Sequence, residues 1–278
     1  MNAPAEDASA PAATEHARRA ASFGAAATAY AEHRPDYPVA AIRWAIEPAL
    51  RREPRPARIL DLGAGTGKLT AQLAGLDLDG ARPDVIAVEP DPHMLAQLRR
   101  GLPGVTAAAG RAEAIPLPDA SVDAVLAGQA AHWFDLVRAL PEIARVLRPG
   151  GVFAGLWNTD DDRVAWVAGL HQVSGRKNAV AFTSYRPEDE DEITAWVLGP
   201  GQDLFLPPEA AGFPHGHVRT AASLVATMRT HSMFLIMEPD EREAVLGAVA
   251  GFLAATPETS SGTFTFPLWT LAQRIVRR

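Results

Sequence analysis

The sequence predicts an α/β fold in which a parallel sheet is covered by helices on both faces. From residue 58 onward, five short apolar runs alternate with amphipathic segments of helical length. The first run leads into a glycine-rich turn that opens a helix, an arrangement typical of nucleotide-binding β-α units. Because parallel strands need long right-handed crossovers, repeated units of this spacing favour a parallel sheet.

The individual elements follow from this alternation. Each apolar run is short and contains β-branched residues, which predicts buried strands at residues 59–62, 84–88, 105–108, 122–127 and 152–157. Helices are predicted at residues 39–50, 68–76, 92–99 and 136–147. Gly101 marks the end of one helix, and the Arg-Pro-Gly-Gly run at 148–151 marks the end of another.

Three regions are expected along the chain. Residues 1–20 hold few large side chains and are predicted to be a disordered tail, whereas 21–278 form one domain. The alternation stops after Trp157, and the acidic run and proline breaks of residues 158–212 predict a helical cap inserted over the sheet. Beyond it we expect a strand at 213–219, helices at 221–231 and 239–254, and a strand within 262–276.

The composition excludes several classes of protein. The 278 residues carry 26 Lys and Arg against 33 Asp and Glu, and the net charge of -7 argues against a nucleic-acid partner. The absence of cysteine excludes disulfides and thiolate metal sites and favours a cytoplasmic setting. The longest apolar helical stretch, 244–255, is shorter than the roughly 20 residues that span a bilayer, so no membrane partner is expected. The oligomeric state stays open.

The glycine-rich turn at residues 59–68 reads Ile-Leu-Asp-Leu-Gly-Ala-Gly-Thr-Gly-Lys. A phosphate-binding P-loop needs a glycine five residues before Gly67 and Ser or Thr after Lys68, and neither is present. A dinucleotide fingerprint needs glycine at position 68, and Asp61 would repel its pyrophosphate. Both readings are therefore disfavoured.

Two acidic residues point to a different ligand. Asp61 and Glu89 end successive predicted strands, so both carboxylates are expected at the same edge of the sheet. Asp61 suits an ammonium group, and Glu89 suits the two hydroxyls of a ribose. An adenosine ligand with a cationic amino-acid tail, S-adenosylmethionine, meets both requirements.

Four ordered motifs resemble those of class I S-adenosylmethionine-dependent methyltransferases. They are the glycine turn at 59–67, Glu89-Pro90-Asp91, the segment 111–123 and the segment 147–151. Residues 30–38 (Tyr-Ala-Glu-His-Arg-Pro-Asp-Tyr-Pro) and 129–135 (Gln-Ala-Ala-His-Trp-Phe-Asp) resemble the small-molecule branch that includes trans-aconitate methyltransferases. The resemblance covers about residues 23–157 and implies a Rossmann-like sheet.

The resemblance also implies roles for individual residues in binding the cofactor. Asp61, Gly63, Ala64 and Gly65 would flank the methionine moiety, Glu89 and Pro90 the ribose, Ala112 and Glu113 the adenine, and Gln129 the sulfonium. Arg34 would pair with the methionine carboxylate.

His132 follows a predicted strand and is expected at the same sheet edge. Its imidazole could act as a general base for an oxygen or nitrogen acceptor, or it could only orient the loop; a carboxylate acceptor would need no base. Trp133 and Trp157 are expected to line the substrate pocket. His215 and His217 lie on one face of a predicted strand, but no third ligand is near in sequence, so no metal site is expected.

The sequence thus predicts a methyltransferase that moves a methyl group from S-adenosylmethionine to a small molecule, with S-adenosylhomocysteine as product. Whether oxygen, nitrogen or carbon is methylated stays open. The alternatives are a non-catalytic S-adenosylmethionine-binding module and a methyltransferase that acts on RNA or protein.

Overall fold

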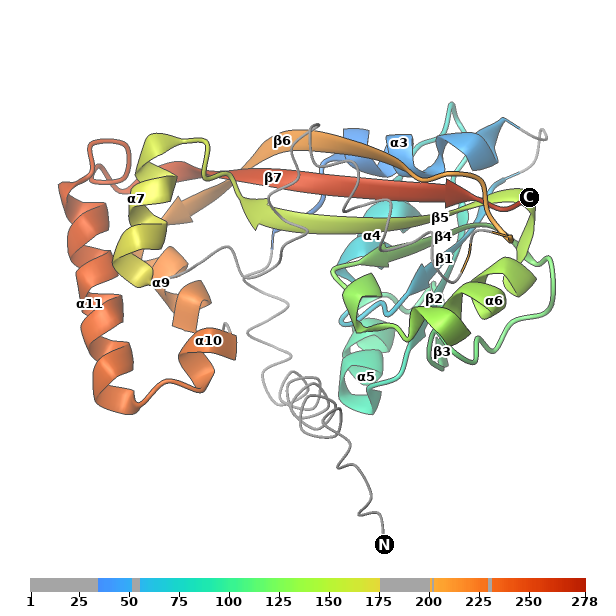
Figure 1. Ribbon diagram of the computed structural model, residues 1–278, viewed down its shortest axis with the longest axis horizontal. Helices are drawn as coiled ribbons and strands as arrows, with labels where there is room; N and C mark the ends of the chain where they lie inside the picture. The colour runs from blue at the N-terminus through green and yellow to red at the C-terminus, as the bar shows by residue number, and fades with distance from the viewer. Residues whose placement is uncertain (1–34, 52–55, 176–200, 202, 230–231) are drawn as a thin grey trace, which may run out of the picture.

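The computed structural model describes residues 35–51, 56–175, 201, 203–229 and 232–278, and a seven-stranded sheet forms its centre (Figure 1). The strand order is β3-β2-β1-β4-β5-β7-β6. The strands are β1 (Arg58–Leu62), β2 (Asp84–Glu89), β3 (Thr106–Ala109), β4 (Val122–Gly128), β5 (Leu147–Asp160), β6 (Glu209–Thr220) and β7 (Thr263–Val276). The helices are α3 (Val39–Leu50), α4 (Lys68–Gly75), α5 (Pro92–Gly101), η1 (Ala131–Trp133), α6 (Leu136–Val146), α7 (Ala165–Ser174), α9 (Ala221–Arg229), α10 (Ser232–Leu235) and α11 (Pro239–Ala255).

The predicted elements of the α/β part are confirmed. Helix α3 has the predicted bounds, and the other predicted helices and strands of this part agree in type, although β5 is longer than expected. Strands β1 to β5 pair in parallel. The sheet is mixed, because β7 is antiparallel to both of its neighbours.

The direction of β7 has a simple cause. The last residue of β6, Thr220, pairs with the first residue of β7, Thr263. The helices α9, α10 and α11 therefore lie within a long hairpin connection, and the chain re-enters the sheet at the end where it left. Return at the same end makes the pair antiparallel.

Two apolar clusters cover the two faces of the sheet. Helices α3 and α4 pack on one face, against Leu126 of β4 and Leu156 of β5. Helix α6 packs on the opposite face, against Val125 and Phe153. Alternate residues of each strand thus point to opposite helical layers, as in a sheet that is buried on both sides.

A separate helical lobe lies at the far end of β6 and β7 (Figure 1). Residues of α7, α9 and α11 pack there against Phe264, Phe266 and Leu268 of β7. Helix α7 falls within the predicted cap, but residues 158–160 continue β5 and 209–212 begin β6, so the lobe combines α7 with α9–α11. Residues 176–200 of the expected cap and the expected tail lie outside the described residues.

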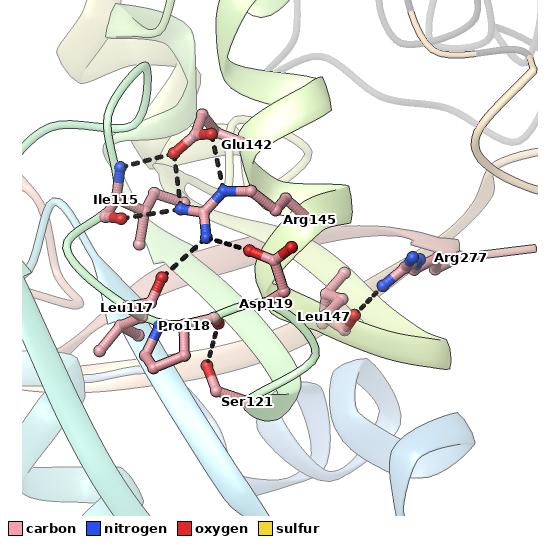
Figure 2. A network of polar contacts seen from close by, with 9 residues as sticks. All are labelled: Ile115, Leu117, Pro118, Asp119, Ser121, Glu142, Arg145, Leu147 and Arg277. Atoms are coloured by element: carbon pink, nitrogen blue, oxygen red, sulfur yellow. Dashed lines mark hydrogen bonds and ion pairs between the residues drawn. The ribbon is translucent and has the colours of Figure 1, made fainter.

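The connection from β3 to β4 is fixed to α6 by the guanidinium of Arg145 (Figure 2). Arg145 donates to the carbonyl oxygens of Ile115 and Leu117 at 2.9 and 2.8 Å, and to the Asp119 carboxylate at 2.8 Å. Glu142 binds both Arg145 and the Ile115 N–H. This network holds the segment that follows the expected adenine-binding residues.

None of the helices in the described ranges combines the length and apolar character that a membrane crossing requires.

Candidate functional site

The candidate site lies at the edge of the sheet where β1, β2 and β4 end. In open α/β sheets, ligands bind at this edge where the strand order changes direction. That point lies between β1 and β4, because β2 and β3 lie on one side and β5 on the other. Asp61 lies near the end of β1, Glu89 ends β2 and Gln129 follows β4. The structure therefore brings these three predicted residues to one edge.

The glycines of the loop after β1 have distinct roles. Gly63, Gly65 and Gly67 all have positive φ, at 72°, 57° and 92°. A Cβ on Gly63 would lie 2.7 Å from the Cβ of Ala130, and one on Gly67 would lie 2.9 Å from Leu98 Cγ, so both glycines allow close packing. A Cβ on Gly65 would have one neighbour within 4 Å, the sulfur of Met94 at 3.9 Å. The backbone at Gly65 is thus less crowded than at Gly63 and Gly67, which leaves more room for a ligand.

Asp61 is the most unusual polar residue of the site. Its side chain is buried, and its Oδ2 accepts a hydrogen bond from Thr70 Oγ1 at 2.6 Å. Its Oδ1 is also buried, and it has no hydrogen-bond partner within the described ranges. Burial, helped by the nearby charge of Glu89 and opposed by hydrogen bonds from Thr70, raises the pKa of this carboxyl to about 7. A positively charged ligand group at Oδ1 would remove this penalty.

Glu89 holds the glycine loop from the neighbouring strand. Its Oε2 accepts from the Gly65 N–H at 2.8 Å and its Oε1 from the Asp91 N–H at 2.9 Å. Burial raises the pKa of Glu89, although these two hydrogen bonds oppose the shift. A carboxylate oxygen accepts more than one hydrogen bond, so Glu89 retains capacity for hydroxyl donors. Pro90 beside it is exposed.

The segments after β3 and β4 complete the expected cofactor set. Ala112 is buried, and Glu113 Oε1 accepts from the Asp135 N–H at 2.9 Å, before α6. Gln129 has a φ of 54°, which is uncommon for a residue other than glycine. Its Nε2 donates to the Asn158 carbonyl at 2.7 Å. Backbone conformations of this kind cluster at functional sites.

His132 has a defined hydrogen bond with the next strand. Trp157 Nε1 lies 3.2 Å from His132 Nδ1, and an indole nitrogen only donates, so Nδ1 accepts. The neutral imidazole therefore carries its proton on Nε2. The Trp133 ring lies 4.9 Å from that of His132 and is partly exposed. Trp157 is 3% exposed and belongs to the core under α6, and its indole N–H links it to His132.

Sequence reasoning missed two residues that support the site. Thr70 binds Asp61 from the first turn of α4, and Asn158 of β5 binds the side chain of Gln129 through its carbonyl. Neither residue belongs to a motif that could have identified it. Arg34, the expected partner of the methionine carboxylate, lies outside the described residues. Ala64 lies within the loop, and its N–H donates to the Val88 carbonyl at 3.1 Å.

Comparison with known proteins gives consistent matches. A family model for a methyltransferase domain matches residues 60–155. An uncharacterised methyltransferase of Mycobacterium tuberculosis is 53% identical over 155 residues. These residues cover 56% of this chain and 59% of that protein, so the match spans less than two thirds of the relative. An uncharacterised methyltransferase-like protein of Schizosaccharomyces pombe is 36% identical over 219 residues, 78% of this chain and 79% of that protein. A solved structure of a candidate type II methyltransferase from Anaeromyxobacter dehalogenans has a TM-score of 0.65 and 30% identity, and the match covers 88% of this chain and 97% of the other.

The Asp61→Asn variant should be more stable than the wild type at pH 8 when no ligand is bound. The folded-state pKa of Asp61 is raised above its ordinary value of 3.8 to about 7, so the carboxyl lowers stability progressively as pH rises from about 4 to 7. Removal of the carboxyl should raise the free energy of unfolding by up to about 4 kcal/mol at pH 8 and by almost nothing at pH 4. Urea denaturation at both pH values measures the difference.

The matched control is Asp79→Asn. Asp79 is exposed in a turn and has a φ of 54°, which asparagine adopts readily. Its substitution should leave stability nearly unchanged at both pH values. Equal stability of the Asp61→Asn variant and the wild type at pH 8 would contradict the interpretation of Asp61.

Proposed function

Because this chain belongs to the methyltransferase family, we propose that it transfers a methyl group from S-adenosylmethionine to a small-molecule acceptor and releases S-adenosylhomocysteine. The observation that carries the proposal is the buried carboxylate of Asp61 at the foot of the glycine loop, with one oxygen that no described residue satisfies. The proposal leaves the acceptor atom open between oxygen, nitrogen and carbon.

The residues at the sheet edge fit this cofactor in charge and shape. Asp61 Oδ1 would accept from the ammonium group, directly or through water, in a charge-assisted hydrogen bond. The methionine chain would pass beside Gly65, where the absence of a side chain leaves space. Glu89 would accept from the ribose hydroxyls, and the segment around Ala112 and Glu113 would border the adenine.

Catalysis in this proposal depends mainly on positioning. When bound, the cofactor would supply a methyl group activated by a positively charged sulfur, and the residues of the site would place the acceptor in line with the bond between the methyl carbon and that sulfur. Gln129, fixed by its bond to Asn158, would border the reacting centre. His132 would hold the acceptor by donating from Nε2. Action as a base would require it to lose its bond to Trp157, so the geometry favours a donor.

Two alternatives predict different results in one experiment. The full chain is incubated with methyl-labelled S-adenosylmethionine and either a filtered metabolite extract, bulk RNA or bulk protein. Label in a small molecule supports the proposal. Label in RNA or protein supports a macromolecular methyltransferase, and binding of S-adenosylhomocysteine without any transfer supports a non-catalytic module.

The Glu89→Ala variant should bind S-adenosylhomocysteine about 10- to 150-fold more weakly than the wild type, because charge-assisted bonds to the ribose are lost, a change of about 1.5–3 kcal/mol. Isothermal calorimetry measures the affinity, with NAD as a ligand that should not bind. Glu89 also accepts a hydrogen bond from the Gly65 N–H, so its loss could disturb the glycine loop. Glu89→Gln keeps an oxygen that can accept this bond, and it should therefore lose less affinity for S-adenosylhomocysteine than Glu89→Ala. An unchanged dissociation constant in Glu89→Ala would place the ribose elsewhere.

The His132→Ala variant should raise the Michaelis constant for the acceptor more than it lowers kcat, with kcat reduced by less than about tenfold. His132→Asn should restore much of the loss, because an amide donates a hydrogen bond but cannot take up a proton. Steady-state kinetics with the acceptor found in the labelling experiment test both variants. A kcat loss of about 100-fold or more in both would show that His132 is a base.

A further inference from the structure

A row of polar side chains interrupts the apolar face of the sheet on which α3 packs. It consists of Asn158 and Asp160 of β5, Thr270 of β7, and His215, His217 and Arg219 of β6, here called the polar strip. In the register Asn158 lies opposite Thr270, and His215 lies opposite Leu268. Directly paired residues share a face. The strip therefore lies between the cluster under α3 and the cluster of the helical lobe.

The polar strip is connected to the candidate cofactor site along two routes. Gln129 Nε2 donates to the Asn158 carbonyl, which brings the strip to the expected sulfonium side. Lys68 directly follows the glycine loop, and its Nζ lies 3.4 Å from Asp36 Oδ1. The charges of Lys68 and Asp36 both act on His217. With the sulfonium beside Gln129, as in the proposed function, the strip would border the side from which an acceptor approaches the methyl group.

Hydrogen bonds determine which nitrogen of His215 carries the proton. Asn158 Nδ2 donates to the carbonyls of Pro35 and Asp36 at 3.4 and 3.1 Å, so its Oδ1 is turned toward Thr270. Thr270 Oγ1 donates to Asn158 Oδ1 at 2.5 Å and has a lone pair for His215 Nδ1, 3.4 Å away. His215 Nδ1 therefore donates, and the neutral ring keeps a bare lone pair on Nε2.

The lone pair of His215 lies in a buried, polar setting. Nε2 is buried and has no hydrogen-bond partner within the described ranges. Burial lowers the pKa of His215, so the ring is neutral at pH 7, although backbone groups of Phe213 and Asp36 favour the protonated form. The same groups would stabilise the imidazolium after it takes up a proton. The strip itself contains the charged or titratable groups His217, Arg219 and Asp160, and Lys68 and Asp36 lie beside it. Asp160 is bound by His171 at 2.9 Å.

Resting on the proposed function, we propose that His215 is the general base for an acceptor that carries an acidic hydroxyl, of the phenol or enol class. The hydroxyl proton passes to Nε2, the oxygen forms the new bond to the methyl carbon, and the carbon–sulfur bond breaks with its electron pair left on sulfur. The imidazolium then loses its proton to water. A neutral imidazole takes up a proton more readily from an acidic hydroxyl than from a simple alcohol, which favours phenols and enols.

The test begins with the ring itself. Nitrogen-15 NMR of the full chain, with His215→Gln to assign the signal, should show the Nδ1–H form of His215 at neutral pH. Thr270→Val should shift the ring toward the Nε2–H form, because the hydroxyl that receives Nδ1–H is lost. The matched control is Thr265→Val, on the same strand with its side chain on the other face. An Nε2–H ring in the wild type would overturn the proposal.

The second readout is binding of 4-nitrophenol in the presence of S-adenosylhomocysteine, at a pH below the pKa of the free phenol. The wild type should bind the neutral phenol through its O–H, and His215→Leu, which has no acceptor atom, should weaken this binding at least tenfold. Equal behaviour of the two proteins would overturn the proposal. Calorimetry should give the wild type and the His215 variant affinities for S-adenosylhomocysteine that agree within a few-fold. If neither protein binds S-adenosylhomocysteine, the proposed function is contradicted. The NMR result then tests the protonation of His215 separately.

Discussion

The site depends on one buried carboxylate. Asp61 lies on the central strand of the parallel half, between β2 and β4, and its side chain is buried there. Thr70 satisfies one oxygen, and no residue in the described ranges satisfies the other. Such a group lowers the stability of the unliganded fold and makes a cation at this point favourable. The open backbone at Gly65 beside it supplies the space that a cationic tail requires.

Two histidines, His132 of the candidate site and His215 of the polar strip, differ in which ring nitrogen is protonated. At His132 the indole N–H of Trp157 donates to Nδ1, so the neutral imidazole carries its proton on Nε2. At His215 the hydroxyl proton of Thr270 is donated to Asn158, so His215 Nδ1 donates to the Thr270 oxygen. The neutral ring therefore has no proton on Nε2. One ring is thus prepared to donate a hydrogen bond and the other to accept a proton. Neighbouring residues rather than the histidines themselves assign these roles.

The parallel half and its two acids could be predicted because they depend on local patterns. Alternating apolar runs identify β1 to β5, and Asp61 and Glu89 follow from their positions on successive strands. The antiparallel β7 could not be predicted, because three helices separate it from its partner β6 and hide the return of the chain. The contact of Thr270 with Asn158 joins residues 112 positions apart, and only the register of the sheet brings them together.

The central claim, that a cationic cofactor group binds at Asp61, is tested most directly by carbon-13 NMR of labelled aspartate carboxyls. The pH titration of Asp61, assigned with Asp61→Asn, is recorded with and without S-adenosylhomocysteine. Without ligand the midpoint should lie at about 7. With ligand the carboxyl should stay ionised to a clearly lower pH, because the ammonium group favours the charged form. A midpoint that does not change while the ligand is bound would contradict the account.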